Sequence, residues 1–165
     1  MNIIKPKSRI ILCGKAASGK DHLRKVLQGR GFTYGVSYTT RPPREGEVDG
    51  RDYYFLDESE FQSLIDEGFF YEYITFNGWF YGTSKEQWYN TDDVFIMTPS
   101  GVNKIRPSDR KHSFIILLDM PIEIRRERLK GRNDNNDSIE RRIEADERDF
   151  ANFTDFDIKL TDPNF

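Results

Sequence analysis

The feature that most constrains the fold is an apolar run at residues 9–13 that leads directly into a glycine-rich segment. The run is continuous rather than alternating, which is typical of a strand in a parallel sheet whose two faces are both covered by helices. The pattern then changes to that of a helix, because Leu23, Val26 and Leu27 fall on one face before glycines end it. A buried strand, a tight turn and a helix in this order predict an α/β fold with a central parallel sheet.

The glycine-rich segment fits the phosphate-loop pattern G-x-x-x-x-G-K in the context that this pattern requires, after a buried strand and before a helix. Its residues are Gly14, Lys15, Ala16, Ala17, Ser18, Gly19 and Lys20. In such a loop, backbone N–H groups converge on anionic oxygens, the helix N-terminus adds a partial positive charge, and the lysine ammonium reaches the β- and γ-phosphates. We therefore expect the segment to bind ATP; a glycine-rich turn without a ligand is the alternative.

Asp21 departs from the pattern, because a Ser or Thr hydroxyl normally follows the lysine and meets Mg²⁺. A carboxylate is itself a hard oxygen ligand, so Asp21 is a candidate to bind Mg²⁺ directly or through water. Alternatively, Asp21 only favours the first turn of its helix, and both interpretations stay open. The neighbouring His22 is expected to be solvated.

The middle third predicts a small β-rich excursion from the sheet. Residues 35–57 contain adjacent prolines, several glycines and clustered charges, and predict an irregular loop that leads into a strand. A short helix is expected at 58–67, because its apolar residues share one face and a glycine follows. Strands are then expected at 69–76 and 79–82, separated by Asn77-Gly78, a strong signal for a tight hairpin.

The parallel pattern then resumes in the last part of the chain. The expected elements are strands at 94–97, 114–118 and 156–160, a short helical segment at 102–105, helices at 121–130 and 138–152, and a polar loop at 133–137. A chain of 165 residues with 36% hydrophobic residues can bury one sizeable core, so a single domain is expected.

The composition narrows the partners and the compartment. A net charge of −3 offers no broad attraction to nucleic acid or to an anionic membrane. The apolar runs are far shorter than a membrane span needs, and no apolar region of a secretory signal follows the N-terminal basic residues, so we expect a cytoplasmic protein. Cys13 is the single cysteine, and it is expected to be a buried structural residue rather than a reactive thiol.

A second group of functional residues lies in residues 37–55, SYTTRPPREGEVDGRDYYF. Arg41 and Arg44 stand three residues apart on a proline-stiffened loop, which makes a fork suited to a phosphate dianion. This segment resembles the nucleotide-monophosphate segment of guanylate kinases, and the likeness extends over about residues 9–162. A solvated charged loop is the alternative, but it leaves the order of the hydroxyls, arginines and tyrosine unexplained.

The resemblance assigns roles in binding GMP. The residues that match the phosphate-binding positions are Arg41, Arg44, Tyr53 and Tyr81, and those that match the guanine-reading positions are Ser37, Glu72 and Thr83. The chemistry agrees, because guanine presents adjacent N1–H and N2–H donors that one carboxylate accepts together. Adenine has no N1–H, so a carboxylate disfavours it.

A third group of basic residues flanks the polar loop and matches the lid of the family. It comprises Arg128, Arg132, Arg141 and Arg142. The resemblance implies that Arg132 and Arg142 close over the ATP phosphates, with Arg128 also at the ATP site, because phosphoryl transfer depends on positioning and charge neutralisation. Ordinary surface pairs with nearby glutamates are the alternative. The residues expected to act in catalysis are Lys20, Arg41, Arg132 and Arg142.

Two further positions depart from the family pattern. Thr98 stands where guanylate kinases usually carry an Asp, and Thr161-Asp162 stands where they commonly carry Asn-Asp near the adenine. These changes bear on the preference for ribose or deoxyribose, the geometry of the metal site, the reaction rate and the selectivity for the donor base.

The resemblance implies a P-loop fold of three layers around a parallel sheet. It divides the chain into a core (1–34, 84–127 and 143–165), a GMP-binding region (35–83) and a helical lid (128–142). The expected reaction is transfer of the γ-phosphoryl group of ATP to GMP or dGMP with Mg²⁺, by a monomer or weak dimer. The alternatives are a catalytically weak module that binds GMP or a phosphopeptide, and a broader deoxynucleoside monophosphate kinase.

Overall fold

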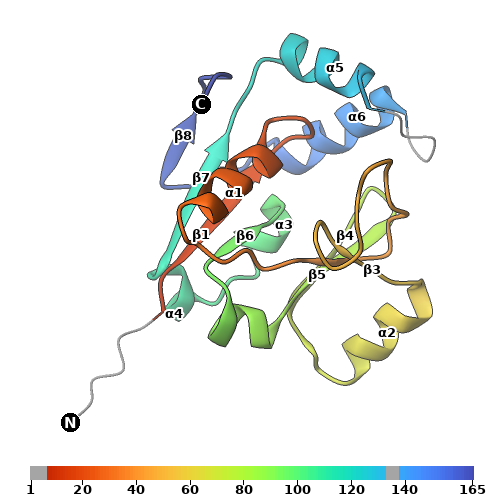
Figure 1. The fold of residues 1–165 in the computed structure, drawn as a ribbon, viewed down its shortest axis with the longest axis vertical. Coiled ribbons are helices and arrows are strands. Elements are labelled where there is room, and N and C mark those ends of the chain that lie inside the picture. Colours follow the sequence, from red (N-terminus) through yellow and green to blue (C-terminus); the bar gives the residue numbers. More distant parts are fainter. Residues whose placement is uncertain (1–6, 133–137) are drawn as a thin grey trace.

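The computed structural model describes residues 7–132 and 138–165, and a parallel sheet lies at its centre (Figure 1). Within these residues the sheet has four strands in the order β6-β1-β7-β8, and each neighbouring pair is parallel. The strands are β1 (Arg9–Gly14), β6 (Val94–Ile96), β7 (Ser113–Leu118) and β8 (Ile158–Leu160).

The two faces of β1 explain why its sequence is apolar throughout. Ile11 belongs to a cluster that extends to Phe150 of α6 (Ile139–Phe150). Leu12 belongs to a different cluster, against which α1 (Lys20–Gly29) packs. Because helices cover both faces, successive residues of the strand are all removed from water. The predicted α/β fold of three layers around a parallel sheet is confirmed.

A second sheet forms the β-rich excursion, in the order β3-β2-β5-β4. Its strands are β2 (Tyr38–Thr39), β3 (Tyr54–Phe55), β4 (Phe70–Phe76) and β5 (Trp79–Ser84). Asn77 and Gly78 join β4 to β5 with positive φ angles of 52° and 86°. Two successive positive φ angles match the twist of antiparallel strands, so the tight hairpin predicted from this dipeptide is confirmed.

The helix α2 (Glu58–Asp66) covers the second sheet and has a strong N-terminal signal. The Asp57 side chain accepts a hydrogen bond from the Glu60 backbone N–H, and the Glu60 side chain accepts one from Asp57. On its buried face, the Phe61 ring stacks between Phe70 (4.5 Å between ring centroids) and Phe80 (5.1 Å). These contacts hold the helix against the hairpin.

The expected helical segment at 102–105 is wrong in its position. The helix α3 (Pro99–Val102) begins three residues earlier, because the Thr98 hydroxyl caps it by accepting from Gly101 N–H at 3.2 Å and Pro99 suits the first helical turn. Elements that the sequence did not predict are β2, α4 (Pro107–Arg110) and a π-helical turn at Gln87–Thr91. The helix expected at 121–130 is α5 (Ile122–Lys130).

Tyr71 of β4 joins the two sheets. Its ring stacks on Trp88 with 4.3 Å between centroids and an interplanar angle of 11°. Its hydroxyl donates to the Asp109 carboxylate at 2.6 Å. Tyr71 and Trp88 belong to the same buried cluster as Ile11 of the central strand, so both sheets share one hydrophobic core.

Cys13 is fully buried, and burial raises the pKa of its thiol to about 12, as expected for a structural residue. Among the helices in residues 7–132 and 138–165, none combines the length and the apolar character that crossing a membrane requires. The polar loop expected at 133–137 lies outside the described residues.

Candidate active site

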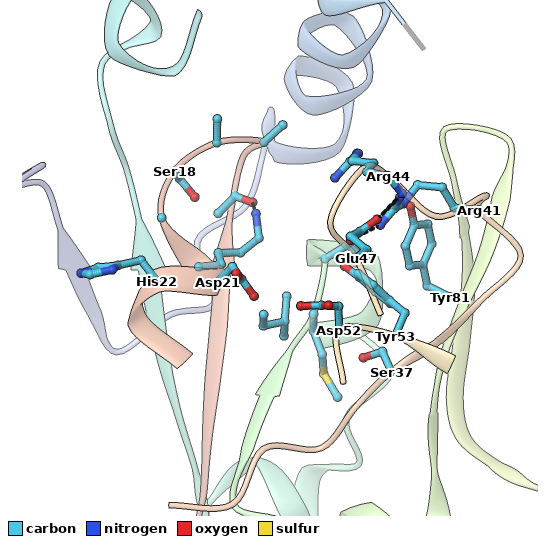
Figure 2. A pocket seen from close by; sticks show the side chains of 18 of the residues that line it. Ser18, Asp21, His22, Ser37, Arg41, Arg44, Glu47, Asp52, Tyr53 and Tyr81 are labelled. Atoms are coloured by element: carbon cyan, nitrogen blue, oxygen red, sulfur yellow. Dashed lines mark hydrogen bonds and ion pairs between the residues drawn. The ribbon is translucent and has the colours of Figure 1, made fainter. Parts of the chain in front are cut away.

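A cleft of about 840 Å³ lies between the glycine-rich loop of the first sheet and the β-rich region (Figure 2). The predicted site residues that line it are Gly14, Ala16, Ala17, Ser18, Gly19, Lys20, Asp21, Ser37, Arg41, Arg44, Tyr53, Glu72, Tyr81, Arg128 and Arg132. Three predicted residues are set back from its surface: Lys15, Thr83 and Arg142. The structure therefore gathers residues from the beginning, middle and end of the chain around one cavity of the size of a ligand site.

The glycine-rich loop has the backbone of an anion-binding loop. Gly19, at the N-terminus of α1, has φ 102°, and Ala17 has φ 61°, which a residue other than glycine seldom adopts. A side chain at Gly14 would meet the Ser18 hydroxyl at 2.5 Å and the Leu118 carbonyl at 2.7 Å. Only glycine at position 14 lets the loop turn this tightly beside β7.

Lys20 follows this loop and folds back over it. Its ammonium donates to the carbonyl oxygens of Gly14 and, at 3.1 Å, of Lys15. Burial lowers the pKa of Lys20 to about 8, while the carboxylate of Asp146 acts in the opposite direction. An anion at the loop would replace the two carbonyl contacts and favour the charged ammonium.

Asp21 borders the cleft with its carboxylate 56% exposed. Its Oδ1 accepts from the Arg24 Nε at 2.7 Å, and its Oδ2 lies 3.0 Å from the Lys25 ammonium. These contacts give geometric support to the interpretation of Asp21 as a first-turn helix residue. His22 is exposed, as expected, and its ring lies 5.6 Å from that of Phe165.

Arg41 is held by a carboxylate that the sequence analysis did not single out. Its guanidinium donates to both oxygens of Glu47, at 2.8 and 3.0 Å, and it lies 5.0 Å from the centroid of the Tyr53 ring. Although burial acts to lower it, these bonds keep the pKa of Arg41 above its ordinary value. Glu47 also accepts from the Arg44 backbone N–H at 2.6 Å, so it fixes both arginine positions of the loop.

The remaining arginines form a positive cluster with contributions from distant segments. Burial and then the charge of Arg41 lower the pKa of Arg44. Burial and the charge of Arg44 lower the pKa of Arg132, which keeps an exposed face at the end of α5. For Arg142 of α6, burial together with Arg44 and Arg132 lowers the pKa to about 10. Like charges that perturb one another in this way create a positive potential, which attracts an anion.

The cleft also has a polar part, where the hairpin of β4 and β5 lies next to α3. Glu72 is 6% exposed, and its carboxylate accepts from the Thr83 hydroxyl at 2.7 Å. Burial raises the pKa of Glu72 to about 7, and the bond from Thr83 acts against this change. Ser37 is also buried and lines the same cavity. A buried carboxylate whose hydrogen-bond partner is a neutral hydroxyl is suited to accept further hydrogen bonds from a ligand.

The helices α5 and α6 contact the glycine-rich loop from the other side. Arg128 donates to the carbonyls of Ala17 (3.0 Å) and Pro163 (3.3 Å). Asp146, 3% exposed, accepts from the Ala16 backbone N–H at 2.9 Å, and Lys15 forms an ion pair with the next residue, Glu147. The side chain of Lys15 therefore points away from the cleft, although its backbone belongs to the loop.

The sequence analysis did not identify Glu47 or Asp146 as site residues, although the sequence contains a weak signal for each. Glu47 follows Arg44 by three residues in a loop, a spacing that permits a local side-chain to backbone bond. Asp146 follows Arg142 by four residues on one helix, so both fall on the same face. Neither signal indicates the distant partner that gives the residue its place in the site.

The fold and this cleft define a P-loop protein in which a cluster of arginine side chains faces the glycine-rich loop. Comparison with known proteins identifies the family. The chain belongs to the guanylate kinase family, whose family model matches residues 6–165.

The chain matches several relatives over most of their length. The guanylate kinase of Nostoc sp. is 35% identical in an alignment 164 residues long, which covers 94% of this chain and 82% of that protein. The guanylate kinase of Sus scrofa is 34% identical in an alignment 149 residues long, which covers 85% of this chain and 75% of the relative. A crystal structure of guanylate kinase from Anaplasma phagocytophilum has the same fold, with a TM-score of 0.71 at 22% identity, over 96% of this chain and 78% of that one.

Proposed function

We propose that the chain is a guanylate kinase that transfers the γ-phosphoryl group of ATP to GMP or dGMP, giving ADP and GDP or dGDP. The observation that carries this proposal is that Glu72 and Lys20 line one cleft. Arg41 and Arg44 line the same cleft. Glu72 suits a guanine base, Lys20 a polyphosphate, and the two arginines suit the phosphate of the acceptor.

Guanine recognition rests on the polar part of the cleft. The Glu72 carboxylate accepts the N1–H and N2–H of guanine, while the hydroxyls of Ser37 and Thr83 serve the base edge and hold the carboxylate. Adenine cannot supply the same pair of donors, and it leaves the buried carboxylate without a hydrogen bond from the base. This part of the cleft therefore favours guanine over adenine.

Transfer of the phosphoryl group requires positioning and charge neutralisation rather than a covalent protein intermediate. An oxygen of the acceptor phosphate attacks the γ-phosphorus while the bond from that phosphorus to the β–γ bridging oxygen breaks, and ADP leaves. Lys20 and the loop N–H groups bind the donor, Arg41, Arg44, Tyr53 and Tyr81 bind the acceptor phosphate, and Arg132 and Arg142 neutralise charge between them. Closure around both nucleotides excludes water as a competing acceptor.

The donor set near the loop fits Mg²⁺, which usually takes one or two carboxylates in addition to substrate phosphates. Asp21 presents a hard, half-exposed carboxylate at the edge of the cleft, and it would hold the ion directly or through water. When bound, Mg²⁺ neutralises charge on the β- and γ-phosphates. The carboxylate would then exchange part of its contact with Lys25 for the metal.

The test is ADP production from ATP and Mg²⁺ with GMP, dGMP, AMP, dTMP or no acceptor. We expect turnover only with guanine nucleotides, and a loss of at least about a hundredfold in Lys20→Met, because removal of one transition-state donor commonly has this effect. Lys25→Met is the matched control, since Lys25 lies on the same helix with an exposed side chain. It should retain activity.

Three outcomes would contradict the proposal in different ways. Comparable turnover with AMP or dTMP would indicate a broader nucleoside monophosphate kinase. Binding of GMP without turnover by any acceptor would indicate a binding module. Full activity in Lys20→Met would show that the loop does not act on the donor.

A further inference from the structure

Arg24 is a buried charge that the proposed reaction does not use. It lies on α1 with 2% of its surface exposed. Its Nε donates to Asp21 at 2.7 Å, its Nη1 donates to Gln28 at 3.0 Å, and its guanidinium lies 4.6 Å from the centroid of the Tyr34 ring. These contacts within and beside α1 hold the guanidinium in one orientation.

The same guanidinium reaches across to the loop at residues 41–53, which we call the acceptor loop. Its Nη2 donates to Asp52 Oδ1 at 2.8 Å, and Asp52 is 7% exposed. The other oxygen of Asp52 accepts from the Val48 backbone N–H at 2.8 Å. Asp52 therefore joins Arg24 to the backbone of the acceptor loop at a buried point.

The bonded segment of the acceptor loop is the part that carries the phosphate-binding residues. Val48 directly follows Glu47, which holds Arg41, and Asp52 directly precedes Tyr53. Figure 2 shows Asp21 on α1 and Asp52 on the acceptor loop on facing sides of the cleft. Arg24 bonds to both carboxylates and so bridges the two sides.

We propose that Arg24 is a positioning residue, which fixes the acceptor loop relative to α1 through Asp52 and thereby places the GMP phosphate against the donor loop. This inference rests on the proposed function. Between β2 and β3 the acceptor loop has no regular secondary structure, so its position depends on side-chain bonds. α1 is instead anchored by the glycine-rich loop and by packing on the sheet. Loss of the bond between Arg24 and Asp52 should therefore displace the acceptor loop and leave the glycine-rich loop in place.

The experiment compares Arg24→Met, Asp52→Asn and the double variant with the wild type. KM for GMP should rise about tenfold in each single variant, because each removes a charge-assisted hydrogen bond that holds the loop. KM for ATP should stay within about twofold in Asp52→Asn, which leaves the bond from Arg24 to Asp21 in place. The double variant should exceed the larger single effect by no more than about twofold, because both changes break the same bond.

Two further measurements separate positioning from general loss of structure. Calorimetric titration with GMP gives the binding change directly, so it decides the matter even if the wild type shows no turnover and the proposed function fails. Lys25→Met is the matched control: Lys25 also pairs with Asp21 from α1 but makes no contact with Asp52, and GMP binding should change less than twofold. Asp52→Asn keeps the acceptor for Val48 N–H, so it remains informative if Arg24→Met does not fold.

The inference is overturned by any of three results. The first is unaltered GMP binding in folded Arg24→Met or Asp52→Asn protein. The second is an equal rise of KM for ATP and KM for GMP in Asp52→Asn, which is the mark of general destabilisation. Fully multiplicative effects in the double variant would show that the two residues act independently.

Discussion

Glu72→Gln should lower kcat/KM for GMP and at the same time raise the stability of the fold. In the proposed complex the wild-type carboxylate accepts two hydrogen bonds from guanine, each worth about 1.5–3 kcal/mol because the acceptor is charged. A glutamine oxygen keeps at most one of them, and its NH₂ group faces a donor. A loss of about 2–3 kcal/mol follows, which lowers kcat/KM for GMP by about 30- to 150-fold. KM for ATP should hardly change.

The effect on stability has the opposite sign and depends on pH. Burial raises the pKa of Glu72 from 4.5 to about 7, so the folded protein binds this proton more tightly than the unfolded chain does. The ionised carboxylate therefore destabilises the fold, with a penalty that is absent below about pH 4.5 and complete above about pH 7. The difference corresponds to at most about 3 kcal/mol. Glutamine carries no charge and avoids the penalty, while its oxygen still accepts from Thr83.

The assay is thermal unfolding of the wild type and Glu72→Gln at pH 5 and pH 8, with steady-state kinetics at pH 8. The variant should gain up to about 6–12 °C in Tm relative to the wild type at pH 8, and much less at pH 5. The exposed Glu67 provides the control, because Glu67→Gln should change neither quantity. Equal stabilities at pH 8 would refute the claim of an ionised buried carboxylate, and undiminished GMP turnover would refute its role in guanine recognition.

Two further predictions concern the acceptor loop and the core. Glu47→Gln should raise KM for GMP about tenfold with little change in KM for ATP, because Arg41 loses one of its two charged bonds; equal kinetics in the variant would show that Glu47 does not orient the arginine. Cys13 should resist a thiol reagent in the folded protein at pH 8 and react at the rate of unfolding in urea, because burial raises its pKa to about 12; rapid labelling of native protein would contradict this.

The fold was predictable where one physical cause determined each element. The run at 9–13 had to be buried on both faces, and the Asn77-Gly78 pair specified a hairpin. The strand β2 was missed because two residues are too few to show an alternating hydrophobic pattern. It is defined by its pairing with β3 and β5. The start of α3 was missed because the Thr98 cap was read only as a departure from a family pattern.

The resemblance to guanylate kinases is confirmed by relatives, whereas the individual site roles stay predictions. The sequence identified residues that carry recognisable chemistry, such as Lys20 and Glu72, because motif spacing or family order placed them. It did not identify partners that act through tertiary contact. Asp146 meets Ala16 across 130 positions of the chain, and Arg24 meets Asp52 across 28. Such pairings depend on how the layers dock, which local pattern does not encode.

The stacking of Tyr71 on Trp88 determines how the molecule can be divided. A segment cut out at residues 35–83 would keep the first ring and lose the second, together with Asp109, which accepts a hydrogen bond from the tyrosine hydroxyl. The β-rich excursion therefore shares part of its core with the parallel sheet, and we expect the two to unfold as one cooperative unit. A chimaera that exchanges this region between relatives must carry a compatible aromatic pair on both sides of the junction.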